Sequence, residues 1–203
     1  GLAEAFLIGE EFIGKDPVCL VLGDNIFYGQ ELNVLIEEAL NQSDIATVFG
    51  YTVKDPQRYG VIDFDTTGKA LSIEEKPEDP KSDKAVVGLY FYPNDVIQMA
   101  KKVKPSLSGE LQITSINQEY LNLERIDVKI LGRGFAWLDT GTHEALLEAS
   151  KFIEVIEKRQ GLKIACVEEI SFNNKWIGKK EILNSIKFYG NCEYSNYLKK
   201  IIS

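Results

Sequence analysis

The feature that most constrains the fold is a pair of apolar runs, residues 17–25 and 44–53, separated by an amphipathic segment. The runs, PVCLVLGDN and DIATVFGYTV, are mostly apolar, which is typical of parallel strands buried on both faces. Between them, residues 30–41 place apolar side chains on one face of a helix, namely Leu32, Leu35, Ile36, Ala39 and Leu40. This order predicts a βαβ unit, in a fold that binds its ligands at the carboxyl ends of the strands.

The rest of the chain continues the alternation of strands and helices. A hairpin is expected over residues 58–77, with its turn at Asp65-Thr66-Thr67-Gly68. Asn94 and Thr142 are the expected N-caps of two of the later helices. Helices are expected over 1–14, 94–103, most of 107–122 and 142–160, and strands over 85–93, 127–132 and 134–139. Short helices follow residue 161, so the chain predicts an α/β fold with a mixed, mainly parallel sheet and a helical C-terminal part.

Length and composition fit one globular domain with a real core, since 44% of the 203 residues are apolar. No run is long enough for a membrane span and no signal peptide is evident, so we expect a soluble cytoplasmic protein without a membrane partner. The net charge of −8 argues against nucleic acid as a partner. Three scattered cysteines suggest buried thiols. Because the chain opens with Gly1 inside a helical pattern, we expect an incomplete start.

Two carboxylates are candidate metal ligands because each follows a predicted strand. Asp24 ends LVLGD and Asp139 ends FAWLD. Two such side chains suit Mg²⁺, which prefers oxygen ligands and usually keeps one or two protein carboxylates. Each residue alone is better explained as a turn or helix-capping Asp, and that alternative stays open.

Further candidates lie at the ends of the hairpin. Lys76 is a cation that suits a phosphate, and Pro77 after it favours extended backbone; Glu75 suits sugar hydroxyls. A solvated charge cluster is the alternative for both. Gly60, after Tyr59, would let the backbone approach a sugar, and Gly88 within a strand signals either a ligand or close packing. The one histidine, His143, suits a surface or capping role.

Six motifs, in order, carry a family resemblance: LVLGDNIF, RYGVIDFD, EEKP, AVVGLYFY, SGELQIT and GRGFAWLDTGTHEALLEAS. Together with the tail GLKIACVEEISFNNKWIG, this set resembles the bacterial glucose-1-phosphate thymidylyltransferases. The resemblance implies a Rossmann-like nucleotidyltransferase core over residues 1–160 and a helical extension over 161–203. It also implies the reaction of dTTP with glucose 1-phosphate to give dTDP-glucose and pyrophosphate, which serves dTDP-rhamnose and surface polysaccharide synthesis.

The resemblance also implies roles for the matching positions. Asp24 and Asp139 would hold Mg²⁺, and Lys76 would bind the sugar phosphate. Gly1 and Leu2 would touch the nucleotide. The glucose site would be lined by Tyr59, Gly60, Glu75 and Val86, with Trp137 nearby. Relatives commonly form tetramers with a dTDP-rhamnose effector site, to which Arg133, Glu168 and Glu169 would contribute.

The chain departs from the family pattern in two places. The glycine-rich GGxGTRL loop, which cradles the triphosphate in the family, does not occur in the 203 residues, so we expect negligible turnover from them alone. In SGELQITS, Ser108, Gln112 and Ser115 stand where the family usually carries an arginine and two acids. The arginine would bind the sugar phosphate. Two alternatives therefore remain: a non-catalytic relative that keeps the sugar pocket or the oligomer interface, and a transferase with another sugar or base.

Overall fold

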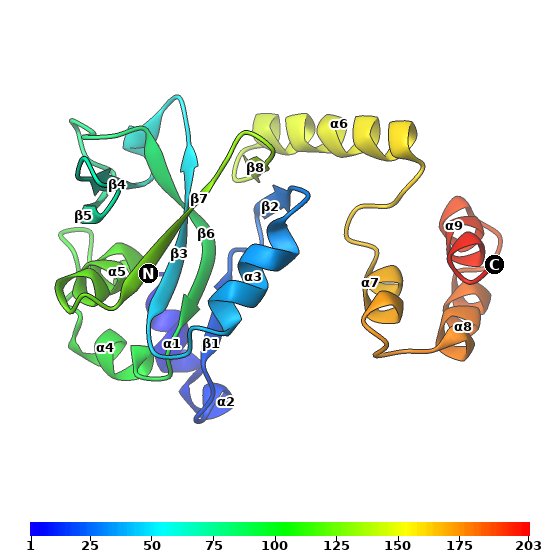
Figure 1. The fold of residues 1–203 in the computed structure, drawn as a ribbon, viewed down its shortest axis with the longest axis horizontal. Coiled ribbons are helices and arrows are strands. Elements are labelled where there is room, and N and C mark those ends of the chain that lie inside the picture. Colours follow the sequence, from blue (N-terminus) through cyan, green and yellow to red (C-terminus); the bar gives the residue numbers. More distant parts are fainter. The chain divides into compact units, whose positions relative to one another are not determined.

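The computed structural model describes all 203 residues, which form two compact units, Gly1–Gly141 and Thr142–Ser203 (Figure 1). The first unit contains the sheet and the second consists of helices. The long helix of residues 143–160 thus belongs to the second unit. A functional division at residue 160 stays a prediction.

The first unit is built on a mixed sheet in the order β5-β4-β6-β3-β7, with β1 also paired to β6. Its strands are β1 (Val18–Val21), β3 (Ala46–Thr52), β4 (Gly60–Phe64), β5 (Ala70–Glu75), β6 (Lys84–Tyr92) and β7 (Ile126–Leu131); β2 (Asn25–Tyr28) and β8 (Ala136–Asp139) form a separate ribbon. Its helices are α1 (Glu4–Ile8), α2 (Glu10–Ile13), α3 (Leu32–Leu40), the short η1 (Pro56–Arg58), α4 (Val96–Lys102) and α5 (Ile113–Asn122). The expected α/β fold with a mixed sheet is confirmed.

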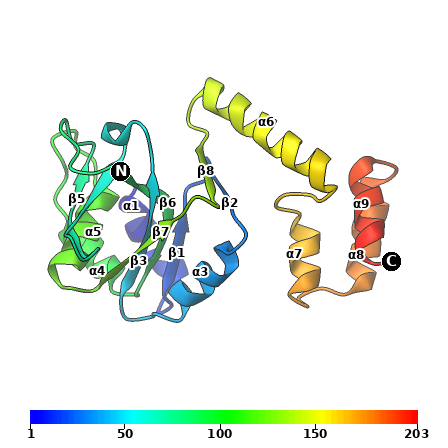
Figure 2. The same ribbon diagram turned by 45° about the horizontal axis from the view of Figure 1, so that its top comes forward.

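Strand β6 is the centre of this sheet, and its side chains alternate between two apolar layers. Val86, Tyr90 and Tyr92 pack with residues of α1, α4 and α5, whereas Val87 and Phe91 pack with residues of α3 and β8. Figure 2 shows α1 and α3 on opposite faces of the sheet. Because both faces are covered, β6 is apolar after its first residue, Lys84, although its neighbours in the sheet run antiparallel to it.

One edge of β6 is shared by two strands, and this division creates the space for a site. Near its start, β6 pairs with β4 through Ala85 and Val61, and near its end it pairs with β1 from Leu89 onward. Residues 86–88 lie between these two partners. A side-chain amide, that of Asn25, accepts the hydrogen bond of Gly88 N–H in this interval, at 3.0 Å.

Strand directions differ from the sequence expectation. Only β3 and β7 pair in parallel. Strand β6 runs antiparallel to both β1 and β3. The first strand of the predicted βαβ unit is also not buried on both faces: β1 alternates between half-buried and exposed residues, and Val21 is 56% exposed. The expectation of buried thiols is wrong for Cys19 and Cys192, which are exposed, and right for Cys166.

Two local expectations were also wrong. Asn94 does not cap α4. Its side-chain amide instead donates to the carbonyl oxygens of Gly14 and Asp16, at 3.1 and 2.8 Å, and these bonds stabilise the loop before β1. The expected N-terminal helix is divided into α1 and α2 at Gly9. The hairpin turn is as expected, with Gly68 at a φ of 88° and the Asp65 carboxylate accepting from Thr67 N and Lys69 N.

The second unit contains α6 (His143–Gln160), α7 (Val167–Asn173), α8 (Lys179–Tyr189) and α9 (Glu193–Ile201). Thr142 caps α6 as expected, since its hydroxyl accepts from Ala145 N at 3.2 Å. A small core of Cys166, Ile182, Tyr197 and Leu198 joins the last three helices. No helix of either unit is both long and apolar enough to cross a membrane.

Candidate functional site

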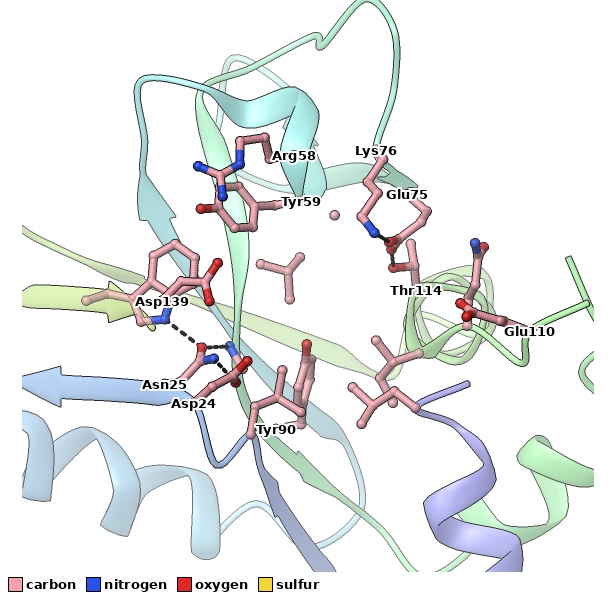
Figure 3. Close-up of a pocket in the computed structure, with 18 residues that line it drawn as sticks. Asp24, Asn25, Arg58, Tyr59, Glu75, Lys76, Tyr90, Glu110, Thr114 and Asp139 are labelled. Carbon is pink, nitrogen blue, oxygen red and sulfur yellow. Dashed lines mark hydrogen bonds and ion pairs between the residues drawn. The ribbon is translucent and has the colours of Figure 1, made fainter. Parts of the chain in front are cut away.

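A cavity of about 290 Å³ opens in the first unit beside the divided edge of β6 (Figure 3). The structure brings together there nearly all of the predicted site residues: Leu2, Asp24, Tyr59, Gly60, Glu75, Lys76, Val86, Trp137 and Asp139. Gly1 is the exception, because it packs beside the cavity against the backbone of Leu111; a Cβ at Gly1 would lie 2.4 Å from the Leu111 carbonyl oxygen. Sequence reasoning did not identify several other lining residues, among them Asn25, Arg58, Tyr90, Glu110 and Thr114.

The two candidate metal-binding carboxylates are brought together by the ribbon of β2 and β8. In this ribbon Asn25 lies opposite Asp139. Thr140 extends the pairing, because its N–H and its hydroxyl both donate to the Asp24 carbonyl oxygen at 2.8 Å. A Cβ built at Gly141 would lie 3.2 Å from Asp139 Oδ1 and 3.7 Å from Asp24 Oδ2. The two side chains therefore lie near each other at the edge of the cavity.

Asn25 connects this carboxylate pair to the floor of the cavity. Its amide oxygen accepts from Trp137 Nε1 at 2.7 Å and from Gly88 N at 3.0 Å, and its Nδ2 donates to Asp24 Oδ1 at 2.8 Å (Figure 3). A Cβ at Gly88 would lie 2.6 Å from the same amide oxygen. The sequence left two explanations open for Gly88, a ligand or close packing. Close packing against Asn25 accounts for the glycine.

Across the cavity, Glu75 and Lys76 stand at the end of β5. The Thr114 hydroxyl donates to Glu75 Oε2, and Lys76 Nζ lies 3.8 Å from Glu75 Oε1. The expectation of extended backbone at Lys76 is wrong, since its φ is 43°. The N–H of Lys76 donates to the Tyr59 carbonyl at 2.9 Å, and this bond helps to hold the residue in a conformation that non-glycine residues rarely adopt. Such backbone strain is found most often at functional sites.

Aromatic rings form a further wall. The Tyr59 and Trp137 rings meet edge to face with centroids 5.1 Å apart, and the Arg58 guanidinium carbon lies 5.5 Å from the centre of the Tyr59 ring. Burial raises the pKa of the Tyr59 phenol; Arg58 opposes this rise and the nearby carboxylate of Asp139 adds to it. Burial likewise raises the pKa of Tyr90, with a smaller contribution from Glu75. Both phenols are therefore neutral hydrogen-bonding groups near neutral pH.

The charges around the cavity favour an added cation. Four carboxylates line it, from Asp24, Glu75, Glu110 and Asp139, against the two cations of Arg58 and Lys76. A phosphate would meet a net negative lining, which a divalent ion at the paired carboxylates would offset. No cluster of three or more potential His, Cys, Asp or Glu ligands occurs in the chain. Two carboxylate groups suit an ion such as Mg²⁺ that takes its remaining ligands from water and phosphate.

The other positions singled out in the sequence, apart from Gln112, lie outside the cavity. Ser108 is exposed and its hydroxyl lies 2.8 Å from that of Ser106, whereas Gln112 lines the cavity. Arg133 is exposed in the first unit. Glu168 and Glu169 lie in α7 of the second unit, where they accept from the hydroxyls of Tyr194 and Tyr197, each at 2.5 Å. An effector site at Arg133, Glu168 and Glu169 stays a prediction.

Comparison with known proteins agrees with this architecture. The model of the nucleotidyl transferase family matches residues 1–155. The chain belongs to the nucleotidyl transferase family. It is 53% identical over 202 residues to the glucose-1-phosphate thymidylyltransferase of Neisseria gonorrhoeae, and 48% identical over 202 residues to that of Mycobacterium tuberculosis. Each alignment spans the whole of this chain and 70% of the relative's length.

Solved structures show the same fold. A Bacillus anthracis protein described as a glucose-1-phosphate thymidylyltransferase, solved in complex with a sucrose, superposes with a TM-score of 0.67 at 39% identity. That match covers 75% of this chain and 60% of the other. A UDP-glucose pyrophosphorylase complexed with UDP-glucose gives a TM-score of 0.66 at 26% identity, over 74% of this chain and 61% of the other. Nucleotidyltransferases that differ in base thus share this fold.

Proposed function

We propose that this chain carries the sugar-phosphate and metal half of the active site of a glucose-1-phosphate thymidylyltransferase. The observation that supports the proposal is one cavity that combines two neighbouring carboxylates, a strained lysine and a polar wall suited to a sugar. In the reaction, an oxygen of glucose 1-phosphate forms a bond to the α-phosphorus of dTTP. The bond from that phosphorus to the bridging oxygen breaks, and pyrophosphate leaves with its electrons.

Asp24 and Asp139 would hold Mg²⁺, because both are oxygen ligands and they lie near each other at the edge of the cavity. The ion, when bound, would neutralise phosphate charge. The protein's own residues bind and orient the substrate. Lys76 supplies a cation to the sugar phosphate, and Arg58, whose guanidinium carbon lies 5.5 Å from the centre of the Tyr59 ring, supplies a second one.

The sugar would lie between the polar and the aromatic walls. Glu75 accepts hydrogen bonds from sugar hydroxyls, while Tyr59, Trp137 and the backbone at Gly60 and Val86 enclose the ring. No general base is required, since the attacking phosphate oxygen is already anionic. Placement and charge neutralisation are sufficient to account for the chemistry.

Binding of glucose 1-phosphate, measured by isothermal titration calorimetry, tests the proposal without requiring the triphosphate loop, which does not occur among the 203 residues. We expect binding that strengthens with Mg²⁺ and falls about tenfold in Lys76→Ala, from the loss of one charge-assisted hydrogen bond. Lys69→Ala is the matched control, because Lys69 is exposed, pairs with Glu124 at 2.9 Å and lies outside the cavity. Equal losses in the two variants, or no binding by the wild type, would refute the proposal.

The same titration addresses the remaining alternatives. Tighter binding of dTDP-glucose than of UDP-glucose supports the thymidylyl assignment, and the reverse order supports a uridylyl transferase. A non-catalytic relative would bind the sugar phosphate without any response to Mg²⁺. A cytoplasmic location, a homotetramer, and a role in dTDP-rhamnose and surface polysaccharide synthesis complete the proposal.

A further inference from the structure

We infer that Asn25 is a positioning residue, which fixes the orientation of the Asp24 carboxylate for metal binding. The inference rests on the proposed function and adds a residue to it. Asn25 follows Asp24 directly and begins β2, opposite Asp139 in the ribbon. Its side chain makes hydrogen bonds with Gly88, Trp137 and Asp24.

The orientation of the Asn25 amide is dictated by its neighbours. The backbone N–H of Gly88 and the indole Nε1–H of Trp137 can only donate. Both point at the same atom of Asn25, so that atom must be the oxygen; a flipped amide would set its NH₂ group against two donors. The NH₂ group is thereby directed to Asp24 Oδ1, 2.8 Å away. An amide oxygen has two lone pairs, and these two donors occupy both of them. The Asn25 amide therefore has no freedom to rotate.

The two oxygens of the Asp24 carboxylate therefore have different surroundings. Oδ1 accepts from Asn25, and Oδ2 is the Asp24 oxygen within 3.7 Å of the Cβ position of Gly141, which also lies 3.2 Å from Asp139 Oδ1. On the other side, Gly141 N donates to Asp139 Oδ1 at 3.1 Å. Each carboxylate is therefore held by a neighbouring donor before any ion binds. Donors of this kind, one step removed from the ion, typically change metal affinity by about 10- to 100-fold when they are removed.

The experiment measures Mn²⁺ affinity by electron paramagnetic resonance, with glucose 1-phosphate present, in the wild type and in Asn25→Ala. Metal-free binding of glucose 1-phosphate and the melting temperature are measured on the same samples. We expect Asn25→Ala to lose about tenfold in Mn²⁺ affinity. Because Asn25 also lines the cavity, metal-free sugar-phosphate binding should weaken too, but by a smaller factor. Tyr51→Phe is the matched control, because it removes the hydrogen bond from the Tyr51 hydroxyl to the Phe135 carbonyl, 3.1 Å long, without touching Asp24.

A second variant covers the case in which Asn25→Ala does not fold. Trp137→Phe keeps an aromatic ring but removes one of the two donors that orient the amide, so we expect a smaller loss of Mn²⁺ affinity, about threefold. Unchanged Mn²⁺ affinity in a folded Asn25→Ala or in Trp137→Phe would overturn the inference alone. Losses of metal affinity, sugar-phosphate affinity and melting temperature in equal proportion would also overturn it, since they indicate a merely structural role. A wild type that binds neither ligand would overturn the proposed function as well.

Discussion

Replacing Lys76 by glycine and by alanine separates the role of its side chain from the cost of its backbone. A φ of 43° places Lys76 in the left-handed region, which costs a non-glycine residue about 1–2 kcal/mol. Glycine avoids this cost but loses about 0.5–1 kcal/mol more conformational entropy on folding than alanine does. The central values differ by about 0.75 kcal/mol, so we expect Lys76→Gly to be more stable than Lys76→Ala by about that amount.

Urea unfolding of the two variants, at equal m-value, measures this difference directly. In calorimetric titrations both variants should bind glucose 1-phosphate about tenfold more weakly than the wild type, because each lacks the ammonium group. The Lys76 side chain is 65% exposed, so solvent and salt will screen its charge and the loss should shrink as ionic strength rises.

Lys175 provides a matched control, because it also has a positive φ, of 61°, but lies in the second unit, outside the cavity. Lys175→Gly should exceed Lys175→Ala in stability by a similar amount, with no change in sugar-phosphate affinity. Equal stability of Lys76→Gly and Lys76→Ala would refute the claim of backbone strain. Wild-type affinity in either would refute the phosphate-binding role.

Three further predictions follow from other contacts. Gly88→Ala should cost about 1–3 kcal/mol of stability and weaken sugar-phosphate binding, because the added methyl group would lie 2.6 Å from the Asn25 amide oxygen; unchanged unfolding in urea would contradict this. Ser108→Arg should strengthen glucose 1-phosphate binding in calorimetry, and an unchanged affinity would count against a phosphate role for position 108. The pKa of Glu157 is lowered from its ordinary value of 4.5, mainly by the hydrogen bond from Lys163, so this carboxylate stabilises the fold above pH 4.5 and less as the pH falls through its lower folded pKa. Lys163→Met should therefore flatten the loss of stability below pH 4.5, as measured by urea unfolding over a pH series.

The sequence predicted those parts of the fold that are encoded locally. Helix α3 and the hairpin of β4 and β5 carry clear periodicity or turn residues, and Thr142 is a strong capping residue. Strand direction is not encoded in this way. Strand β6 reads as a buried parallel strand because both of its faces are covered, although it runs antiparallel to β1, β3 and β4.

The site was predicted where a residue type and a strand end coincide, as at Asp24, Lys76 and Asp139. Asn25 was not predicted, because the hydrogen bonds that place it in the site come from Gly88 and Trp137, which are distant in sequence. The ribbon itself was missed, since the four residues of β2, NIFY, show no alternation of burial. The expectation at Lys76 failed because a tertiary hydrogen bond to the Tyr59 carbonyl outweighs the local preference of a residue before proline.

A crystal of the protein grown with Mn²⁺ and glucose 1-phosphate tests the central claim most directly. The anomalous difference map should show one Mn²⁺ peak bound by Asp24 and Asp139, with the sugar phosphate between that ion and Lys76. A peak bound elsewhere, or a sugar phosphate outside this cavity, would contradict the account.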